Sequence, residues 1–316
     1  MTRCPRVSLR LYCSVPAKAV YPHFFLEWFL GGPMIEALQQ KAATLIEALP
    51  YMRRFAGETL VVKYGGHAMS NDEAAVSFAQ DLVLLQSIGI KVVVVHGGGP
   101  QIQTMLDRVG IKSTFKNGYR VTDEATMEIV RMVLVGKVNQ EIVSRINKVG
   151  GRAMGLSGAD GGLLIGRQVT VGGEDVGRVG VIEQVDDSEI RLLTDGGLIP
   201  VIAPVAVDAD GEPLNINADL AAGAVAAHLK ARKLLLMTDV DGVLDADGQV
   251  MSTLESADIG RMIDDGTLSG GMIPKMKCSA DAVAAGVRKV HIVNGRIKHA
   301  MLLELFTDSG VGTEVI

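Results

Sequence analysis

Two glycine-rich segments follow predicted strands and could hold an anion between them. The first, residues 91–100, reads KVVVVHGGGP, and its four valines predict a strand buried on both faces of a parallel sheet. Gly97, Gly98 and Gly99 carry no Cβ atoms, so backbone N–H groups can approach a phosphate or carboxylate where a helix begins. A second predicted strand, residues 59–63, runs into Tyr64-Gly65-Gly66. A tight turn would explain one glycine pair, but two such loops favour a polyanion site.

Polar side chains at the predicted strand ends indicate where chemistry could occur, because parallel α/β sheets bind ligands there. They are Lys63, His96, Asn215, Asp219, and Asp239 with Asp241. Asp219 follows Asn215 by four residues, so a helix would present both on one face, although helix capping by Asn217 or Asp219 is an alternative. We expect His96 to be a hydrogen-bonded structural residue.

The sequence lacks the common nucleotide-binding motifs, and its charge and composition argue against several classes of protein. The sequence contains no GxxxxGK followed by Ser or Thr, and no GxGxxG between a strand and a helix, so a Rossmann dehydrogenase is not expected. A net charge of -5 argues against nucleic acid as a partner. No apolar run approaches the ~20 residues that span a bilayer. The three cysteines, two of them in the first 13 residues, argue against a disulfide framework and indicate a reducing compartment, so we expect a cytoplasmic protein.

Strands alternate with helices along the chain, which predicts an α/β fold with an open, mostly parallel central sheet sandwiched by helices. We expect strands at 59–63, 92–95, 199–207, 233–237, 289–293 and 312–316, and hairpins within 150–185. We expect helices at 35–55, 100–109, 123–148, 215–229, 273–285 and 297–306, and one through residue 87 that a capping box at 70–73 begins. Pro50 should bend or split the first helix.

The N-terminal residues differ in character from the rest of the chain. Residues 1–33 contain Arg3, Arg6 and Arg10 and no acidic residue before Glu27, as in an organelle transit peptide. A start codon placed too early is the interpretation we favour, because the amphipathic pattern begins directly after Met34. Organelle targeting stays open.

Six motifs, in order, carry a resemblance to the acetylglutamate kinases of the amino-acid kinase family. They are VVKYGG at 61–66, VVHGGGPQI at 94–102, NGYRVT at 117–122, NINAD at 215–219, TDVDGV at 238–243 and GGMIPKMK at 270–277. The resemblance implies phosphoryl transfer from ATP to the side-chain carboxylate of N-acetyl-L-glutamate, which yields N-acetyl-L-glutamyl 5-phosphate in the second step of arginine biosynthesis. A carboxylate is ionised at neutral pH, so catalysis requires positioning and charge neutralisation rather than a general base.

The resemblance also assigns roles to residues. The catalytic residues would be Lys63, Lys275 and Asp219, with the aspartate orienting the two lysines. The substrate would contact Gly65, Gly66, Gly97, Gly98, Arg120 and Asn215, with Arg120 gripping the α-carboxylate. The nucleotide would contact Thr238, Asp239, Asp241 and Gly242. Mg²⁺ would be held mainly by the ATP phosphates, and we assign it no protein ligand.

A regulatory role follows from the same resemblance. Arginine-inhibited members carry an extra N-terminal helix that interlaces dimers into a homo-hexamer, and residues 35–55 resemble it. L-arginine would bind Tyr51, Arg54, His291, Glu304 and Gly310, with Glu304 pairing the guanidinium. The implied organisation is an extension at 1–33, an oligomerisation helix at 34–56, an acetylglutamate-binding and dimerisation lobe at 57–230, and a nucleotide-binding lobe at 231–316. A PII-type signalling protein is a further implied partner.

Two alternatives stay open. A related kinase could act on another carboxylate or on carbamate, although NINAD and the arginine of NGYRVT argue against it. A non-catalytic arginine-sensing protein could keep the fold, although the presence of both lysines, Lys63 and Lys275, argues against that.

Overall fold

The computed structural model describes residues 33–69, 71–245, 247–308 and 310–316. The chain divides into two units, one ending at Pro50 and the other beginning at Tyr51. Helix α2 (Pro33–Phe55) contains Pro50 and is not split there, because the residues on both sides keep helical structure. The proposed extension at 1–33 lies outside the described residues except for Pro33. The division of the chain into lobes stays a prediction.

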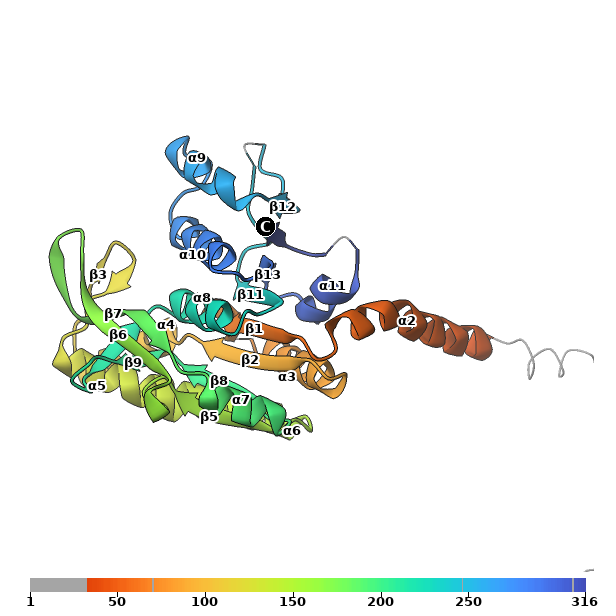
Figure 1. Ribbon diagram of the computed structural model, residues 1–316, viewed down its shortest axis with the longest axis horizontal. Coiled ribbons are helices and arrows are strands. Elements are labelled where there is room, and N and C mark those ends of the chain that lie inside the picture. Colours follow the sequence, from red (N-terminus) through yellow and green to blue (C-terminus); the bar gives the residue numbers. More distant parts are fainter. Residues whose placement is uncertain (1–32, 70, 246, 309) are drawn as a thin grey trace, which may run out of the picture. The chain divides into compact units, whose positions relative to one another are not determined.

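The second unit is built on an eight-stranded sheet with the order β12-β14-β13-β11-β1-β2-β8-β5 (Figure 1). Its strands are β1 (Thr59–Tyr64), β2 (Lys91–His96), β5 (Ala153–Ser157), β8 (Ile199–Ala203), β11 (Lys233–Thr238), β12 (Thr253–Leu254), β13 (Val290–Asn294) and β14 (Thr313–Val315). Every neighbouring pair is parallel except β13 with β14. The predicted α/β fold with a mostly parallel sheet is confirmed.

Both faces of the sheet are buried, because successive side chains of a strand point to opposite sides. Leu60, Val62 and Tyr64 of β1 pack into one core, and Val61 packs into the other. Helices α3 (Asp72–Ser87), α4 (Gly99–Val109), α5 (Glu124–Arg131), α6 (Asn139–Lys148) and α11 (Ala300–Phe306) cover the first face. Helices α7 (Ser188–Asp195), α8 (Ala218–His228), α9 (Ile259–Asp264) and α10 (Met272–Ala284) cover the second. The valine run of β2 is thus a strand buried on both faces, as predicted.

A smaller closed set of strands adjoins the main sheet. It contains β6 (Leu164–Val171), β7 (Glu174–Val185), β9 (Val205–Val207) and β10 (Pro213–Ile216). The antiparallel pair β6 and β7 confirms the predicted hairpin. The single strand predicted at 199–207 was wrong: β8 and β9 belong to different sheets, and Pro204, which has no N–H for a ladder, separates them. A two-stranded hairpin joins β3 (Phe115–Lys116) and β4 (Tyr119–Arg120).

Three predicted helix features were also wrong in detail. The long helix expected at 123–148 is interrupted by η2 (Met132–Val138), a π-helical segment between α5 and α6. The side chain that caps α3 is that of Asn71, whose Oδ1 accepts from the N–H groups of Glu73 and Ala74, and Ser70 of the predicted capping box lies outside the described residues. Asn215 lies on strand β10, so the helix that begins at Ala218 does not carry it. The short 3₁₀ segments are η1 (Gly66–Met69), η3 (Asp160–Gly162) and η4 (Ser256–Asp258).

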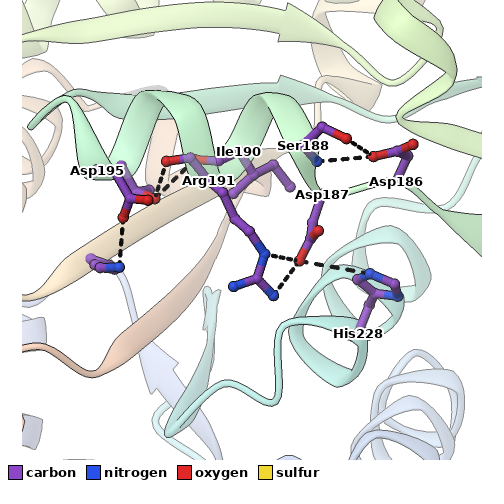
Figure 2. A network of polar contacts seen from close by, with 9 residues as sticks. Asp186, Asp187, Ser188, Ile190, Arg191, Asp195 and His228 are labelled. Atoms are coloured by element: carbon purple, nitrogen blue, oxygen red, sulfur yellow. Dashed lines mark hydrogen bonds and ion pairs between the residues drawn. The ribbon is translucent and has the colours of Figure 1, made fainter.

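Ion pairs near the surface tie α7 to its neighbours (Figure 2). Asp187 pairs with Arg191 at 2.6 Å and lies 3.7 Å from His228 of α8. Asp195 at the other end of α7 pairs with Lys91 of β2 at 2.7 Å. Exposed pairs of this kind each contribute about 0–1 kcal/mol, so they orient the helix more than they stabilise it. In the described part of the chain, no helix combines the length and apolar character needed to cross a membrane.

Candidate active site

An aspartate held between two lysines forms the charged centre of the site. Lys63 Nζ lies 2.9 Å from Asp219 Oδ1, and Lys275 Nζ lies 2.8 Å from Asp219 Oδ2. Lys63 is the penultimate residue of β1, Asp219 lies in the first turn of α8, and Lys275 lies in the first turn of α10. Asn217 caps α8, and its Oδ1 accepts from the Asp219 N–H at 2.8 Å, which holds the backbone of Asp219 in the first turn of the helix. The three predicted catalytic residues are therefore brought together.

Burial and charge determine the protonation of this group. Burial would raise the pKa of Asp219, but Lys63 and Lys275 outweigh it and lower that pKa to about 2. Burial lowers the pKa of Lys63, and the nearby positive charge of Lys275 lowers it further, while Asp219 opposes both effects. Asp219 is thus the countercharge that allows two ammonium groups to share one buried site.

A cleft of about 280 Å³ opens beside this group and contains most of the predicted substrate residues. Lys63, Asp219, Gly66, Gly97, Gly98, Arg120 and Asn215 all line it. Gly65 lies directly behind the lysine, since a Cβ atom there would come within 3.3 Å of Lys63 Cε. Asn215 reaches the cleft from β10, and its Nδ2 donates to Thr122 Oγ1 at 3.1 Å. The four-residue spacing brings Asn215 and Asp219 to one cleft through a strand-to-helix turn, in place of a shared helix face.

Arg120 is held in a fixed orientation at the edge of the cleft. It donates from Nη1 to Gln103 Oε1 at 2.8 Å and to Ser113, and from Nη2 to Gly99 O at 3.1 Å. The guanidinium carbon also lies 4.6 Å from the centre of the Phe115 ring. This support leaves a planar cation against the cleft, as binding of a carboxylate requires. The sequence did not single out Phe115 or Tyr119 of the hairpin, which also line the cleft.

The predicted nucleotide residues follow β11. Thr238 is buried at the end of that strand, and Asp241 accepts from Asn294 Nδ2 at 2.7 Å. Asp239 lies 3.7 Å from Arg296 and is close enough to affect the pKa of Lys63. Gly242 has φ +157°, and a Cβ atom there would lie 2.6 Å from Thr313 Oγ1, so this position has no room for a side chain. These residues lie outside the lining of the first cleft.

A second cleft of about 440 Å³ contains all five residues predicted to bind arginine. They are Tyr51, Arg54, His291, Glu304 and Gly310. His291 Nδ1 lies 2.5 Å from Glu304 Oε1, and the Val311 N–H donates to Glu304 Oε2 at 2.8 Å. Burial lowers the pKa of His291, so the ring is neutral and donates to the carboxylate. A Cβ atom at Gly310 would lie 2.9 Å from Glu304 Oε2, so only glycine leaves that carboxylate undisturbed.

Comparison with known proteins identifies the family. Residues 58–294 match the model of the amino acid kinase family. The chain is 56% identical over 288 residues to an acetylglutamate kinase of Geotalea uraniireducens, a match that covers 88% of this chain and 99% of the relative. It is also 56% identical over 287 residues to an acetylglutamate kinase of Syntrophobacter fumaroxidans, with 88% and 96% covered. The chain therefore belongs to the amino acid kinase family, and within it to the acetylglutamate kinases. This membership confirms the resemblance and the expected class of enzyme, a phosphotransferase with a carboxyl group as acceptor.

Solved structures show the same fold. An N-acetylglutamate synthase of Neisseria gonorrhoeae, complexed with coenzyme A and N-acetyl-glutamate, superposes with a TM-score of 0.78 at 27% identity. That match covers 87% of this chain and 63% of the synthase chain. A carbamate kinase of Giardia lamblia bound to AMP-PNP superposes with a TM-score of 0.60 at 16% identity, covering 83% of this chain and 99% of that one. The carbamate kinase similarity extends to the fold alone.

Proposed function

We propose that Lys63, Asp219 and Lys275 carry the transfer of the terminal phosphoryl group of ATP to the side-chain carboxylate of N-acetyl-L-glutamate. The observation that supports this most directly is the pairing of one buried carboxylate with two ammonium groups beside a cleft lined by glycines. Bringing a carboxylate onto a triphosphate places several negative charges together, and two fixed cations offset that repulsion.

The other residues of the cleft have separate tasks in this proposal. Arg120 binds the α-carboxylate, and Asn215 orients the acetylglutamate. The N–H groups of Gly65, Gly66 and Gly98 bind the oxygens of the transferring group. Thr238, Asp239, Asp241 and Gly242 form the nucleotide side of the site, from which Lys275 reaches the phosphates. Asp219 orients both lysines and needs no proton transfer of its own.

The residues present suit a magnesium ion that enters with ATP. Both oxygens of Asp219 contact lysines, and no group of three or more His, Cys, Asp or Glu side chains in the described residues could hold a metal ion. Mg²⁺ keeps several waters and binds phosphates readily. We propose that the phosphates of ATP hold Mg²⁺ and that the ion offsets their charge.

Feedback inhibition by L-arginine is a second part of the proposal, and the second cleft supports it. Glu304 provides a carboxylate for a guanidinium, and the cleft contains polar groups from the end of α2 and from the C-terminal part of the chain. A homo-hexamer, a PII-type partner and a cytoplasmic location stay predictions that rest on the sequence.

The test is ATP turnover by protein beginning at Met34, with N-acetyl-L-glutamate and with or without L-arginine. Turnover that arginine suppresses supports both parts of the proposal. Turnover that arginine does not affect removes the regulatory part, and turnover of aspartate, glutamate or carbamate in its place refutes the substrate. The full chain is assayed beside the shortened one, and a lack of turnover with any of these acids in both folded proteins refutes the catalytic assignment.

A further inference from the structure

A buried histidine and a buried asparagine lie behind the glycine loop, where the proposed mechanism gives neither of them a role. His96 is the last residue of β2 and is fully buried. Its Nδ1 lies 2.9 Å from Gly97 O, and its Nε2 lies 3.2 Å from Asn139 Nδ2. Asn139 is also buried, and its Nδ2 donates to Val201 O at 2.8 Å. The loop that lines the cleft is therefore held from behind by side chains.

These contacts determine the tautomer of the imidazole. A carbonyl oxygen can only accept, so the proton on His96 must be on Nδ1, which donates to Gly97 O. The Asn139 nitrogen faces the backbone oxygen of Val201, so it is the donor end of the amide, and His96 Nε2 accepts from it. Burial lowers the pKa of His96 to about 4, which keeps the ring neutral at physiological pH. Nδ1 of the ring is thus a donor, and Nε2 is an acceptor.

The tautomer in turn determines the direction of a backbone donor. The Gly97–Gly98 peptide is trans, as are all described peptide bonds, so its C=O and N–H point in opposite directions. The C=O points inward to His96, and the N–H of Gly98 therefore points outward, on the side where Gly97 and Gly98 line the cleft. The Gly97 N–H is already used, because it donates to Tyr64 O at 2.7 Å. In this loop, the donor that His96 directs is that of Gly98.

The π-helical segment η2 explains how Asn139 reaches this position. The Asn139 N–H bonds to Leu134 O, five residues back, which closes the wide turn. The same segment places Leu134 against the loop, since a Cβ atom on Gly98 would lie 2.6 Å from Leu134 Cδ2. Gly155 on β5 leaves room for the amide, because a Cβ atom there would lie 1.9 Å from Asn139 Oδ1. An unbroken α-helix would place different residues behind the loop.

We infer that His96 and Asn139 are positioning residues, which lock the Gly97–Gly98 peptide so that the Gly98 N–H donates to the transferring phosphoryl group. This inference rests on the proposed function. Charge develops on that group as the transition state forms, so a correctly aimed donor raises kcat more than it lowers KM.

Two amide substitutions separate this role from simple filling of the core. In His96→Asn, the amide nitrogen stands near the position of Nδ1 and can still donate to Gly97 O. In His96→Gln, the amide stands near the position of Nε2 and cannot. Both replace a neutral buried ring by a neutral buried amide, and thermal unfolding compares their stability. We expect H96Q to have a kcat at least about tenfold below that of H96N, with KM for N-acetyl-L-glutamate within about threefold. Equal losses, no loss, or the reverse order would overturn the inference.

A second measurement keeps the inference testable if either variant fails to fold. Ring ¹⁵N chemical shifts of the wild-type protein report the tautomer. The His96 signal is assigned as the one missing from a folded His96 variant, or by selective labelling. At neutral pH, a proton on Nδ1 with an unprotonated Nε2 supports the inference, and a proton on Nε2 refutes it. This measurement does not depend on turnover. Failure of the wild-type protein to phosphorylate N-acetyl-L-glutamate would contradict the proposed function, whereas the tautomer tests whether His96 holds the Gly97–Gly98 peptide.

Discussion

Replacing Asp219 by Asn tests the charged centre most directly. The substitution keeps the shape of the side chain and removes the countercharge shared by Lys63 and Lys275. The ionised carboxylate has a pKa of about 2 against 3.8 in an unfolded chain, a difference worth about 2 kcal/mol at 1.36 kcal/mol per unit. Because the folded-state pKa is depressed, this stability is present above pH 4 and lost as the pH falls toward 2. We expect D219N to be less stable at neutral pH by about that amount.

The larger effect of D219N should be on catalysis. Without the aspartate, burial and the charge of Lys275 both lower the pKa of Lys63 and nothing of equal strength opposes them. We expect kcat to fall by about 10²–10³, the scale for losing one electrostatic stabiliser. The alkaline limb of the kcat–pH profile should also move to lower pH, since activity requires protonated Lys63. The assay is ADP release at saturating ATP and N-acetyl-L-glutamate across the neutral and alkaline range.

Asp187→Asn is the matched control. The Asp187 side chain is 16% exposed, against 13% for Asp219, and it pairs with Arg191 at 2.6 Å (Figure 2). It is not among the residues that line the cleft. We expect D187N to keep wild-type kcat. A D219N protein with kcat within about threefold of wild type, or an alkaline limb that stays in place, would refute the role of Asp219.

Four further predictions concern single side chains. Lys63→Ala should lower kcat by about 10²–10³ with the fold intact, and near-normal turnover would remove Lys63 from the site. Arg120→Lys should raise KM for N-acetyl-L-glutamate about tenfold with a smaller change in kcat, because an ammonium group cannot grip two oxygens side by side; an unchanged KM would contradict this. Glu304→Gln should raise the arginine concentration for half-inhibition at least about tenfold, and unaltered inhibition would exclude Glu304 from that site. Because burial depresses the pKa of His96 from 6.5 to about 4, the free energy of unfolding should fall by about 3 kcal/mol as the pH drops across that interval, and His96→Asn should lack this part of the pH dependence.

Much of the site could be predicted from the sequence because its parts are local. A strand followed directly by glycines is recognisable from neighbouring residues, and the structure places Lys63 near the end of β1 and Gly97 after β2 as expected. Five residues, two on the first predicted helix and three in the C-terminal part of the chain, were expected to bind arginine together, and all of them line the second cleft. In both cases the motifs, rather than the periodicity alone, carried the prediction.

Local patterns were less reliable where the identity of an element depended on its partners. A regular apolar pattern predicted one helix from 123 to 148, but the wide turn at η2 depends on what packs against it. Asn215 has a helical spacing to Asp219 and still lies on a strand, because it pairs with Val179 of β7 and Val205 of β9. Such choices depend on contacts far away in the sequence.

The sequence by itself determined which residue types stand at the strand ends, the order of strands and helices, and the family to which those motifs belong. Only the tertiary structure decided which of these groups touch. Lys275 of α10 contacts Asp219, 56 residues earlier in the sequence, and Asn139 of α6 contacts His96, 43 residues earlier. Both contacts form because each of these two helices packs with one particular side facing the sheet. Spacing along the chain sets which side chains share an element, whereas hydrogen bonds and ion pairs between elements depend on the rotation and register that packing of the core selects.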